Sequence, residues 1–359
     1  MPNSSGTPDV VGAGLIIALL PDDRAANDLR AAATSRGYSA LDESDLKSLG
    51  LTMLTFRRPQ GVTGGEAIAV LEKAVPSATV GINHAYRLQQ DSTPLDGLDY
   101  ANDMMRWDKG GCFAQAPIGI IDTGVDTNSA ELKDVQIVSR TFFTGPAAAD
   151  AHGTDVASVL ANPSRLQGGQ IYAANVFGQQ ETSELQAGAD ALVRALDWMA
   201  QEDVHFVNLA LAGPYNKLLD LAVERAVAQG LILVAAVGND GPNVAPLYPA
   251  GFEDVIAVTA VDVNGRVYRH AVRGKHVDVA APGVDVLVST GRNARFVTGT
   301  SIATPLVTAR LAADPSLVSA TSVSDVRKRL AATSAELGSV GRDRVFGYGL
   351  ALAENICGG

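Results

Sequence analysis

The stretch "IGIIDTGVD", residues 118–126, is an apolar run that ends at an aspartate and a glycine-containing turn. Similar runs recur further along the chain: "QIVS" (136–139), "IYAANVF" (171–177), "HFVNLALA" (205–212), "LILVAAVG" (231–238) and "DVIAVTAV" (254–261). Several of them are apolar without interruption, as expected of strands that are covered on both faces. Helical patterns over residues 185–201 and 216–230 lie between these runs. This alternation predicts an α/β fold with a mostly parallel sheet wrapped by helices.

Four polar side chains lie where such a fold places its ligand sites, beyond the carboxyl ends of the strands. Asp122 ends the run at 118–122, and Asn239 follows the run at 231–238. His152 and Ser301 lie at the starts of apolar helical segments, each with a glycine within two residues. These residue types suit acyl transfer, because a serine needs an imidazole base, the imidazole needs a carboxylate, and the oxyanion needs a donor such as a carboxamide.

Each of these residues also has a structural interpretation. An aspartate at a strand end is commonly a turn residue, and a serine at a helix start is commonly an N-cap. The other histidines are interpreted as structural: His84, His205, His270 and His276. The joint occurrence in the order Asp, His, Ser, each with its local glycine, favours the catalytic interpretation.

That order is the one found in subtilisin. The segments "IIDTGVD" (120–126), "HGTDVAS" (152–158) and "GTSIATP" (299–305) resemble the signature blocks of the subtilisin-like serine proteases, and "AAVGNDG" (235–241) resembles their oxyanion-asparagine block. The resemblance extends over residues 105–355. It implies a serine endopeptidase that requires no cofactor. The implied roles are orienting acid for Asp122, general base for His152, nucleophile for Ser301 and oxyanion donor for Asn239.

The segment "VNLALAGP" (207–214) is similar to the strand against which peptide substrates of the family pair. The resemblance implies that the substrate-binding edge is formed by Ala210, Leu211, Ala212 and Gly213. The family often has serine and glycine where this chain has Ala210 and Ala212. We expect the methyl group of Ala212 to crowd a bound peptide or to narrow the first specificity pocket.

No metal site is carried over from the family. The longer calcium-binding loop of the family is not evident between His152 and the run at 171–177. Asp and Asn side chains elsewhere leave calcium binding open. The chain contains no CxxC or HExxH spacing, so a zinc site has no support.

The N-terminal part has a different pattern. Strands are expected over 10–20, 51–59 and 79–89, with another near Asp42, and helices over 22–38 and 63–76. This order, β-α-β-β-α-β, is that of a ferredoxin-like unit. We expect a ferredoxin-like domain at 1–90, a connector at 91–117 and the peptidase domain at 118–359. The resemblance implies that the first domain is a prodomain that assists folding and inhibits the enzyme of a zymogen. Its tail "NHAYRLQQD" (83–91) would lie in the cleft, with processing around 88–100.

Charge and apolar segments limit the partners. The formal net charge of −11 provides no electrostatic footprint for nucleic acid. The resemblance implies protein or peptide substrates. The apolar segment at 10–20 has no basic residue before it and is too short to span a bilayer. It is interpreted as a strand, and neither a signal peptide nor a membrane span is expected in this chain.

The two cysteines, Cys112 and Cys357, lie just before the first strand of the large domain and close to the end of the chain. The sequence is equally compatible with two separate thiols and with one disulfide. A disulfide would indicate an oxidising compartment, so a secreted or periplasmic location is expected.

Two other function classes are a catalytically silent family member and an esterase. A catalytically silent member of the family, used for binding or as a scaffold, would leave Ser301 unlabelled by a fluorophosphonate. An esterase of the α/β-hydrolase type requires a G-x-S-x-G elbow with the aspartate and histidine after the serine. In this chain both precede Ser301, and position 303 is alanine. The sequence therefore argues against the esterase.

Overall fold

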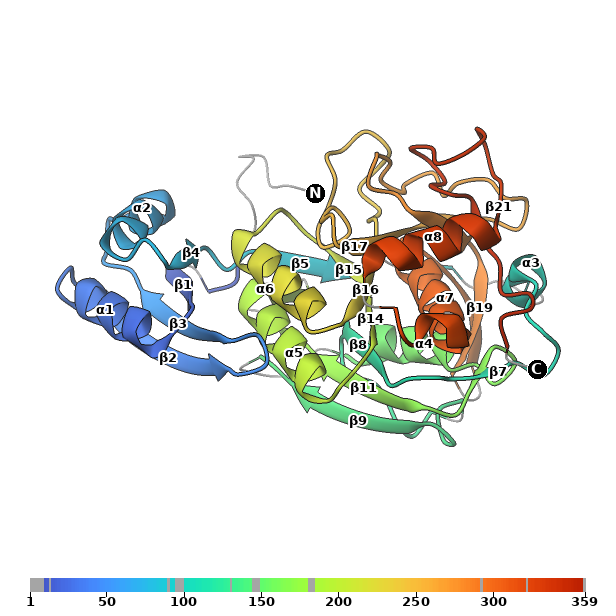
Figure 1. Ribbon diagram of the computed structural model, residues 1–359, viewed down its shortest axis with the longest axis horizontal. Coiled ribbons are helices and arrows are strands. Elements are labelled where there is room, and N and C mark those ends of the chain that lie inside the picture. Colours follow the sequence, from blue (N-terminus) through green and yellow to red (C-terminus); the bar gives the residue numbers. More distant parts are fainter. Residues whose placement is uncertain are drawn as a thin grey trace.

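The computed structural model describes residues 10–12, 14–88, 91–93, 100–129, 131–143, 149–179, 185–290, 293–320 and 322–357. Figure 1 shows a small unit of helices and strands at the N-terminal end, lying beside a much larger α/β unit. The two units meet along α5 and α6 of the larger one, and the chain runs from the first to the second through β5.

A mostly parallel sheet forms the centre of the large unit. Within the described residues it has nine strands in the order β21-β22-β18-β17-β16-β14-β8-β11-β9. Neighbouring strands are parallel except at the β21–β22 edge, which is antiparallel. The bounds are β8 Ile118–Asp122, β9 Gln136–Thr141, β11 Gln170–Asn175, β14 Phe206–Leu209, β16 Ile232–Ala236, β17 Val255–Val261, β18 Val279–Pro282, β21 Ser334–Ala335 and β22 Leu350–Ala351. The predicted α/β fold with a mostly parallel sheet is confirmed.

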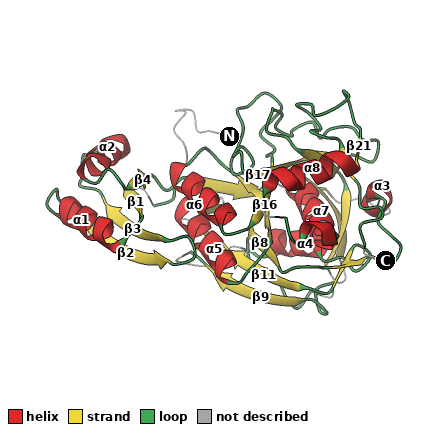
Figure 2. Cartoon of the chain, viewed as in Figure 1, coloured by secondary structure: helices red, strands yellow, loops and turns green. Residues whose placement is uncertain are grey.

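Helices cover both faces of this sheet (Figure 2). They are α4 Ala151–Leu160, α5 Ala189–Gln201, α6 Lys217–Ala228, α7 Thr300–Ala313 and α8 Val323–Thr333, with the short α3 Ala101–Met105 and a 3-10 turn at Pro315–Leu317. On one face a Cβ at Gly119 of β8 would lie 2.6 Å from Met199 Sδ of α5. On the other face, Asn208 of β14 accepts a hydrogen bond from Thr308 of α7 at 3.1 Å. Thus α5 and α7 lie on opposite faces, with α6 beside α5 and α4 beside α7.

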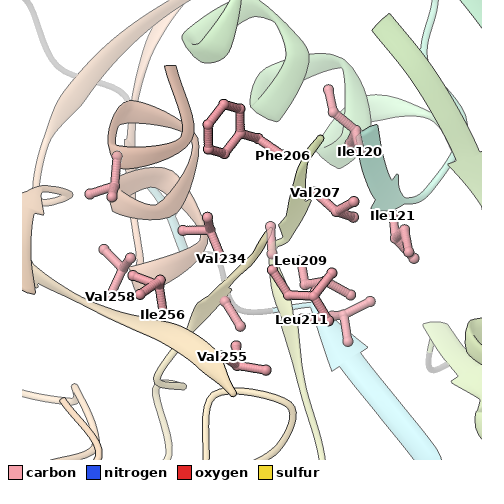
Figure 3. Packing of buried hydrophobic residues seen from close by; sticks show 14 of the residues in the cluster. Ile120, Ile121, Phe206, Val207, Leu209, Leu211, Val234, Val255, Ile256 and Val258 are labelled. Atoms are coloured by element: carbon pink, nitrogen blue, oxygen red, sulfur yellow. The ribbon is translucent and has the colours of Figure 1, made fainter. Parts of the chain in front are cut away.

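The unbroken apolar strands are explained by this double coverage. Figure 3 shows Ile120, Val207, Val234 and Ile256 from four neighbouring strands packed in one cluster. All seven residues of β17 are buried. Because helices lie on both faces, side chains on both sides of these strands are buried, which favours apolar residues.

The small unit contains β1 Leu15–Leu20, α1 Asp23–Thr34, β2 Ser39–Leu46, β3 Leu51–Arg57, α2 Gly64–Ala74 and β4 Thr79–Gly81. Its antiparallel sheet has the order β2-β3-β1-β4. The helices start at sequence-encoded caps, since Asp22 accepts from the Ala25 N–H and Thr63 forms a capping box with Glu66. The element order is the expected β-α-β-β-α-β, although the biological role of this unit remains a prediction.

Both faces of β1 are buried, and they belong to different cores. Ile16 and Leu20 pack in the core of the small unit, beneath its own helices. Ile17 and Leu19 pack in the core of the large unit. In addition, the backbone N–H groups of Ser48 and Leu49 donate to Asp197 of α5. One face of the small sheet is therefore covered only because the large unit lies against it.

Two expected elements are divided differently in the structure. The strand expected at 79–89 is two strands, β4 in the small sheet and β5 Ala85–Leu88 in a different sheet. The helix expected at 185–201 begins only at Ala189, because residues 185–188 form β13 Leu185–Gly188. Both differences arise from pairing between β5 and β13.

Short strands complete the fold. They are β6 Asp91–Thr93, β7 Cys112–Phe113, β10 Leu166–Gln167, β12 Phe177–Gln179, β15 Leu211–Ala212, β19 Val286–Thr290 and β20 Asn293–Thr298. Cys112 and Cys357 form a disulfide with a Cα–Cα distance of 5.1 Å, which ties the C-terminal end of the large unit to its beginning. None of the helices in the described ranges combines the length and apolarity needed to cross a membrane.

Candidate active site

An aspartate–histidine pair lies at the carboxyl end of the sheet. Asp122 is the last residue of β8, is fully buried, and accepts a 2.6 Å hydrogen bond from the Thr123 N–H. His152 is the second residue of α4, and its Nδ1 lies 2.7 Å from Asp122 Oδ1. A carboxylate in this position orients the imidazole and stabilises its protonated form.

The other ring nitrogen of His152 points away from the carboxylate. His152 Nε2 is buried and makes no hydrogen bond to any residue in the described ranges. The ring therefore has one nitrogen engaged by Asp122 and a second one that can accept a proton. No hydrogen bond between this nitrogen and Ser301 is present.

A glycine after the histidine is required by close packing. A Cβ at Gly153 would lie 2.5 Å from Gly124 O and 2.6 Å from Thr123 O. The Gly153 N–H donates to Thr123 Oγ1 at 2.8 Å. The first turn of α4 therefore lies directly on the loop that follows Asp122, which brings the two side chains together. The sequence analysis did not identify Thr123 as part of this arrangement.

Ser301 is the second residue of α7 and is fully buried. The N-cap of α7 is Gly299, so the interpretation of Ser301 as an N-cap is wrong. Helix α7 packs against α4, which carries His152. Ser301 therefore lies in the first turn of a buried helix that packs against the helix carrying His152.

Asn239 lies three residues after the end of β16 and contacts the residue that precedes the serine. Its Oδ1 accepts hydrogen bonds from Thr300 Oγ1 at 2.9 Å and from the Thr300 N–H at 3.2 Å. Thr300 Oγ1 in turn accepts from the Gly238 N–H at 3.2 Å. The carboxamide oxygen is thus held against the start of α7, and Nδ2 is the donor side of the group. Sequence analysis missed Thr300, and its only signal was a hydroxyl residue immediately before Ser301.

The first strand after the small unit, β5, pairs with strands of the large unit. This strand lies between β15 on one side and β13 on the other, antiparallel to both. In the register Leu211 pairs with Leu88 and Ala212 pairs with Arg87. The methyl group of Ala212 therefore does not exclude a neighbouring strand, and its effect on the first specificity pocket stays a prediction. Ala210, just before β15, is fully buried.

The side chain of Tyr86 packs directly against Gly213. The ring is fully buried, and its hydroxyl donates to Pro214 O at 3.3 Å. A Cβ at Gly213 would lie 2.6 Å from Tyr86 Cδ1, so glycine makes room for the ring. Burial raises the pKa of the Tyr86 hydroxyl.

Residues 91–93, which form β6, pair with the strand that leads into the helix carrying Ser301. The backbone of β6 pairs antiparallel with β20, with Asp91 opposite Thr298 and Thr93 opposite Phe296. Thr298 lies three positions before Ser301. Two nearby parts of the N-terminal chain, residues 85–88 and 91–93, thus pair with strands of the large unit. The sequence pattern did not indicate that β13 would pair with β5 or that β20 would pair with β6.

The described residues do not offer a convincing metal site. Asp108, Cys112 and Cys357 are close enough to share an ion, but the two sulfurs are bonded to each other. In the connection between α4 and β11, Asn162 Oδ1 accepts from Ser164 and Ser164 Oγ accepts from Asn102. These oxygens accept hydrogen bonds from protein donors, and calcium binding stays an open prediction.

Comparisons with known proteins identify the family of the chain. Residues 115–349 match the Subtilase family. The chain is 32% identical over 281 residues to the minor extracellular protease Epr of Bacillus subtilis (strain 168), which covers 71% of this chain and 42% of the relative. It is 34% identical over 236 residues to subtilisin DY of Bacillus licheniformis, which covers 63% of this chain and 85% of the relative.

Among solved structures, the chain is similar to fervidolysin from Fervidobacterium pennivorans, described as a keratinolytic enzyme related to subtilisin. The TM-score is 0.76 at 20% sequence identity, covering 97% of this chain and 62% of that chain. At this identity the structural likeness shows the fold. This chain spans less than half of Epr and less than two thirds of fervidolysin. The family match extends across most of the large unit, and the chain therefore belongs to the subtilase family of serine peptidases.

Proposed function

We propose that this protein is a serine endopeptidase made as a self-inhibited precursor. Ser301 is the nucleophile, His152 the general base, Asp122 the orienting carboxylate and Asn239 the oxyanion donor. The observation that carries the proposal is the pairing of residues 85–88 with β13 and β15, and of residues 91–93 with β20, the strand that leads into α7. A peptide substrate crossing a protease cleft would make the same kind of main-chain pairing.

The chemistry follows from the groups around Ser301. Its Oγ attacks the scissile carbonyl carbon while His152 Nε2 takes the hydroxyl proton, and the imidazolium formed is stabilised by Asp122. Asn239 Nδ2 and a backbone N–H donate to the tetrahedral oxyanion. Collapse breaks the C–N bond and passes the proton to the leaving amine. Water then attacks the acyl-enzyme by the same route and restores the serine.

The bond that the enzyme cuts in its own chain lies between Leu88 and Asp91. Pairing with β15 extends to Leu88, and pairing with β20 begins at Asp91. Because the described residues on either side of this interval pair with strands of the large unit, and β20 leads directly into the helix that carries Ser301, we assign the cut to the interval. This narrows the sequence expectation of processing around 88–100. Residues before the cut would act as the intramolecular inhibitor.

We further propose that the protein acts outside the cytoplasm, secreted or in the periplasm. The Cys112–Cys357 disulfide is typical of oxidising compartments. One curated relative is named an extracellular protease.

The proposal is tested by incubating the purified full chain and sequencing the N-terminus of any large fragment. The parent chain is expected to yield a new N-terminus within residues 89–91 and to react with a fluorophosphonate at Ser301. Ser301→Ala, a one-atom truncation inside α7, is expected to keep the same circular dichroism spectrum, to stay intact and to remain unlabelled. A parent chain that neither processes nor labels, even after an added protease removes its first domain, would instead favour the catalytically silent scaffold.

A further inference from the structure

The segment that leads into the cleft is also held by side chains outside the catalytic residues. Residues 85–88 pair through the backbone, which does not distinguish one side chain from another. Asn83 is different, because its side chain is 3% exposed and makes two reciprocal hydrogen bonds with Asp190 of α5. Asn83 Nδ2 donates to Asp190 Oδ1 at 2.7 Å, and the Asp190 N–H donates to Asn83 Oδ1 at 3.1 Å.

The receiving site is held in place by the large unit itself. The second carboxylate oxygen of Asp190 accepts from Arg194, one helical turn later, at 2.6 Å. Arg194 also donates to Phe142 O at 3.1 Å. The orientation of the Asp190 carboxylate is therefore fixed by contacts that do not involve Asn83, so the acceptor atom is preorganised.

The N-cap residue of α5 has no side chain that could occupy the place of the Asn83 carboxamide. This residue is Gly188, which provides no side-chain cap. A Cβ at Gly188 would lie 2.4 Å from Asp190 Oδ1 and 2.7 Å from Asn83 Nδ2. Because N–H groups in the first turn of a helix lack intrahelical partners, the Asn83 carboxamide oxygen acts as the missing cap.

Main-chain contacts on both sides set the register of residue 83. The Ala189 N–H donates to His84 O at 3.1 Å, and Asn216 Nδ2 donates to Ile82 O at 2.8 Å. Asn216 Oδ1 caps α6 by accepting from Leu218 N and Leu219 N, which fixes its Nδ2 toward the segment. Residues at the starts of α5 and α6 therefore hydrogen-bond to the backbone on either side of Asn83.

We propose that Gly188, Asp190 and Asn216 form a distal substrate subsite that selects asparagine three positions before the aromatic residue held at the Tyr86 position. The proposal rests on the proposed function, because it assumes that substrates follow the course of residues 82–93. All three residues belong to the large unit, so they remain in place when the propeptide leaves. The substrate class is an extended peptide of the pattern Asn-x-x-aromatic.

The chemistry of Asp190 discriminates among side chains at this position. Aspartate would bring a second carboxylate to hydrogen-bond distance of Asp190 Oδ1, where like charges repel. Leucine would leave both the Asp190 N–H and its Oδ1 without their partner. Since hydrogen bonds to charged groups are the stronger kind, we expect asparagine to be favoured over leucine by about 10-fold to 100-fold.

The experiment uses full chain that has processed itself and a set of internally quenched peptides. One peptide has the sequence of residues 81–93, two others carry Asp or Leu in place of Asn83, and a short one has residues 85–93 only. The values of kcat/KM are compared for the parent enzyme and for Asp190→Ala. We expect the asparagine peptide to be cut about 10-fold or more faster than the leucine peptide, and this ratio to fall toward one in Asp190→Ala.

Each outcome bears on the proposal. Equal kcat/KM values for the long peptides, with the short peptide also cut, would overturn the distal subsite and leave the proposed function standing. A preference for asparagine that is undiminished in Asp190→Ala, which removes Oδ1 but keeps the N–H of residue 190, would overturn the assignment to the Asp190 carboxylate. If neither the short nor the long peptides are cut, the proposed function fails and the subsite fails with it.

Discussion

Truncation of Tyr86 is expected to release the segment that occupies the cleft. The ring is fully buried. An aromatic side chain buries about 150–250 Å², which corresponds to about 4–6 kcal/mol at about 25 cal/mol per Å². Measured truncations of buried aromatic residues cost about 3–5 kcal/mol. We therefore expect Tyr86→Ala to lower the free energy of undocking β5 by about 3 kcal/mol, which is more than about 100-fold in the equilibrium constant.

The assay is amide hydrogen exchange on the full chain carrying Ser301→Ala, which prevents self-cleavage. Amides of residues 85–88 are followed, and amides of β16 serve as the internal reference for global unfolding. In Tyr86→Ala the β5 amides should exchange about 100-fold faster. The control Tyr86→Phe keeps the ring and loses only the hydroxyl bond to Pro214 O. It should change exchange by about 10-fold or less.

The result that refutes this reasoning is specific. If β5 amides in Tyr86→Ala exchange within a few-fold of the parent rate, while β16 stays protected, the ring does not anchor the segment. Backbone pairing with β13 and β15 would then be sufficient for docking, and the space beside Gly213 would have no energetic role.

Four further outcomes are expected. Asp122→Asn should lower kcat/KM of the processed enzyme by about 10⁴-fold in steady-state assays with a peptide substrate, since the imidazole loses its orienting carboxylate. Thr300→Val removes the hydroxyl bonded to Asn239 and should lower kcat about 10-fold with KM little changed. Burial lowers the pKa of His84 below its usual 6.5, so docking of β5 should be full above about pH 6.5 and weaken as pH falls below it; His84→Gln should remove this pH dependence from the exchange of β5 amides. Cys112→Ser opens a bridge with a sequence separation of 245 and should lower the free energy of unfolding in denaturant by about 2–5 kcal/mol.

Several features could be predicted because they depend on local pattern. The strands of the central sheet were recognisable because burial on both faces requires unbroken apolar runs, as in β17. Asp122, His152 and Ser301 could be proposed from sequence because each lies at an element end with a glycine within two residues, and close packing requires one of these glycines, Gly153. The caps of α1 and α2 could likewise be predicted, because each forms between residues only three positions apart.

Other features could not be predicted because they depend on partners far away in the chain. Residues 185–188 continue a helical pattern, but they are a strand because β5 pairs with them. The contact between Asn83 and Asp190 joins positions separated by 107 residues. Thr300 gains its role only through Asn239, which reaches it from the end of another strand.

The amino-acid sequence by itself determined the class of fold and pointed to the groups that we propose as reactive. Periodicity, caps and glycine positions act over a few residues, and their effect is the same wherever the segment lies. The tertiary structure decided which surfaces meet, namely that β5 fills the cleft, that Asn239 faces Thr300 and that β1 is shared by two cores. These contacts join residues far apart in the chain, and their geometry exists only after the sheet and its helices have packed.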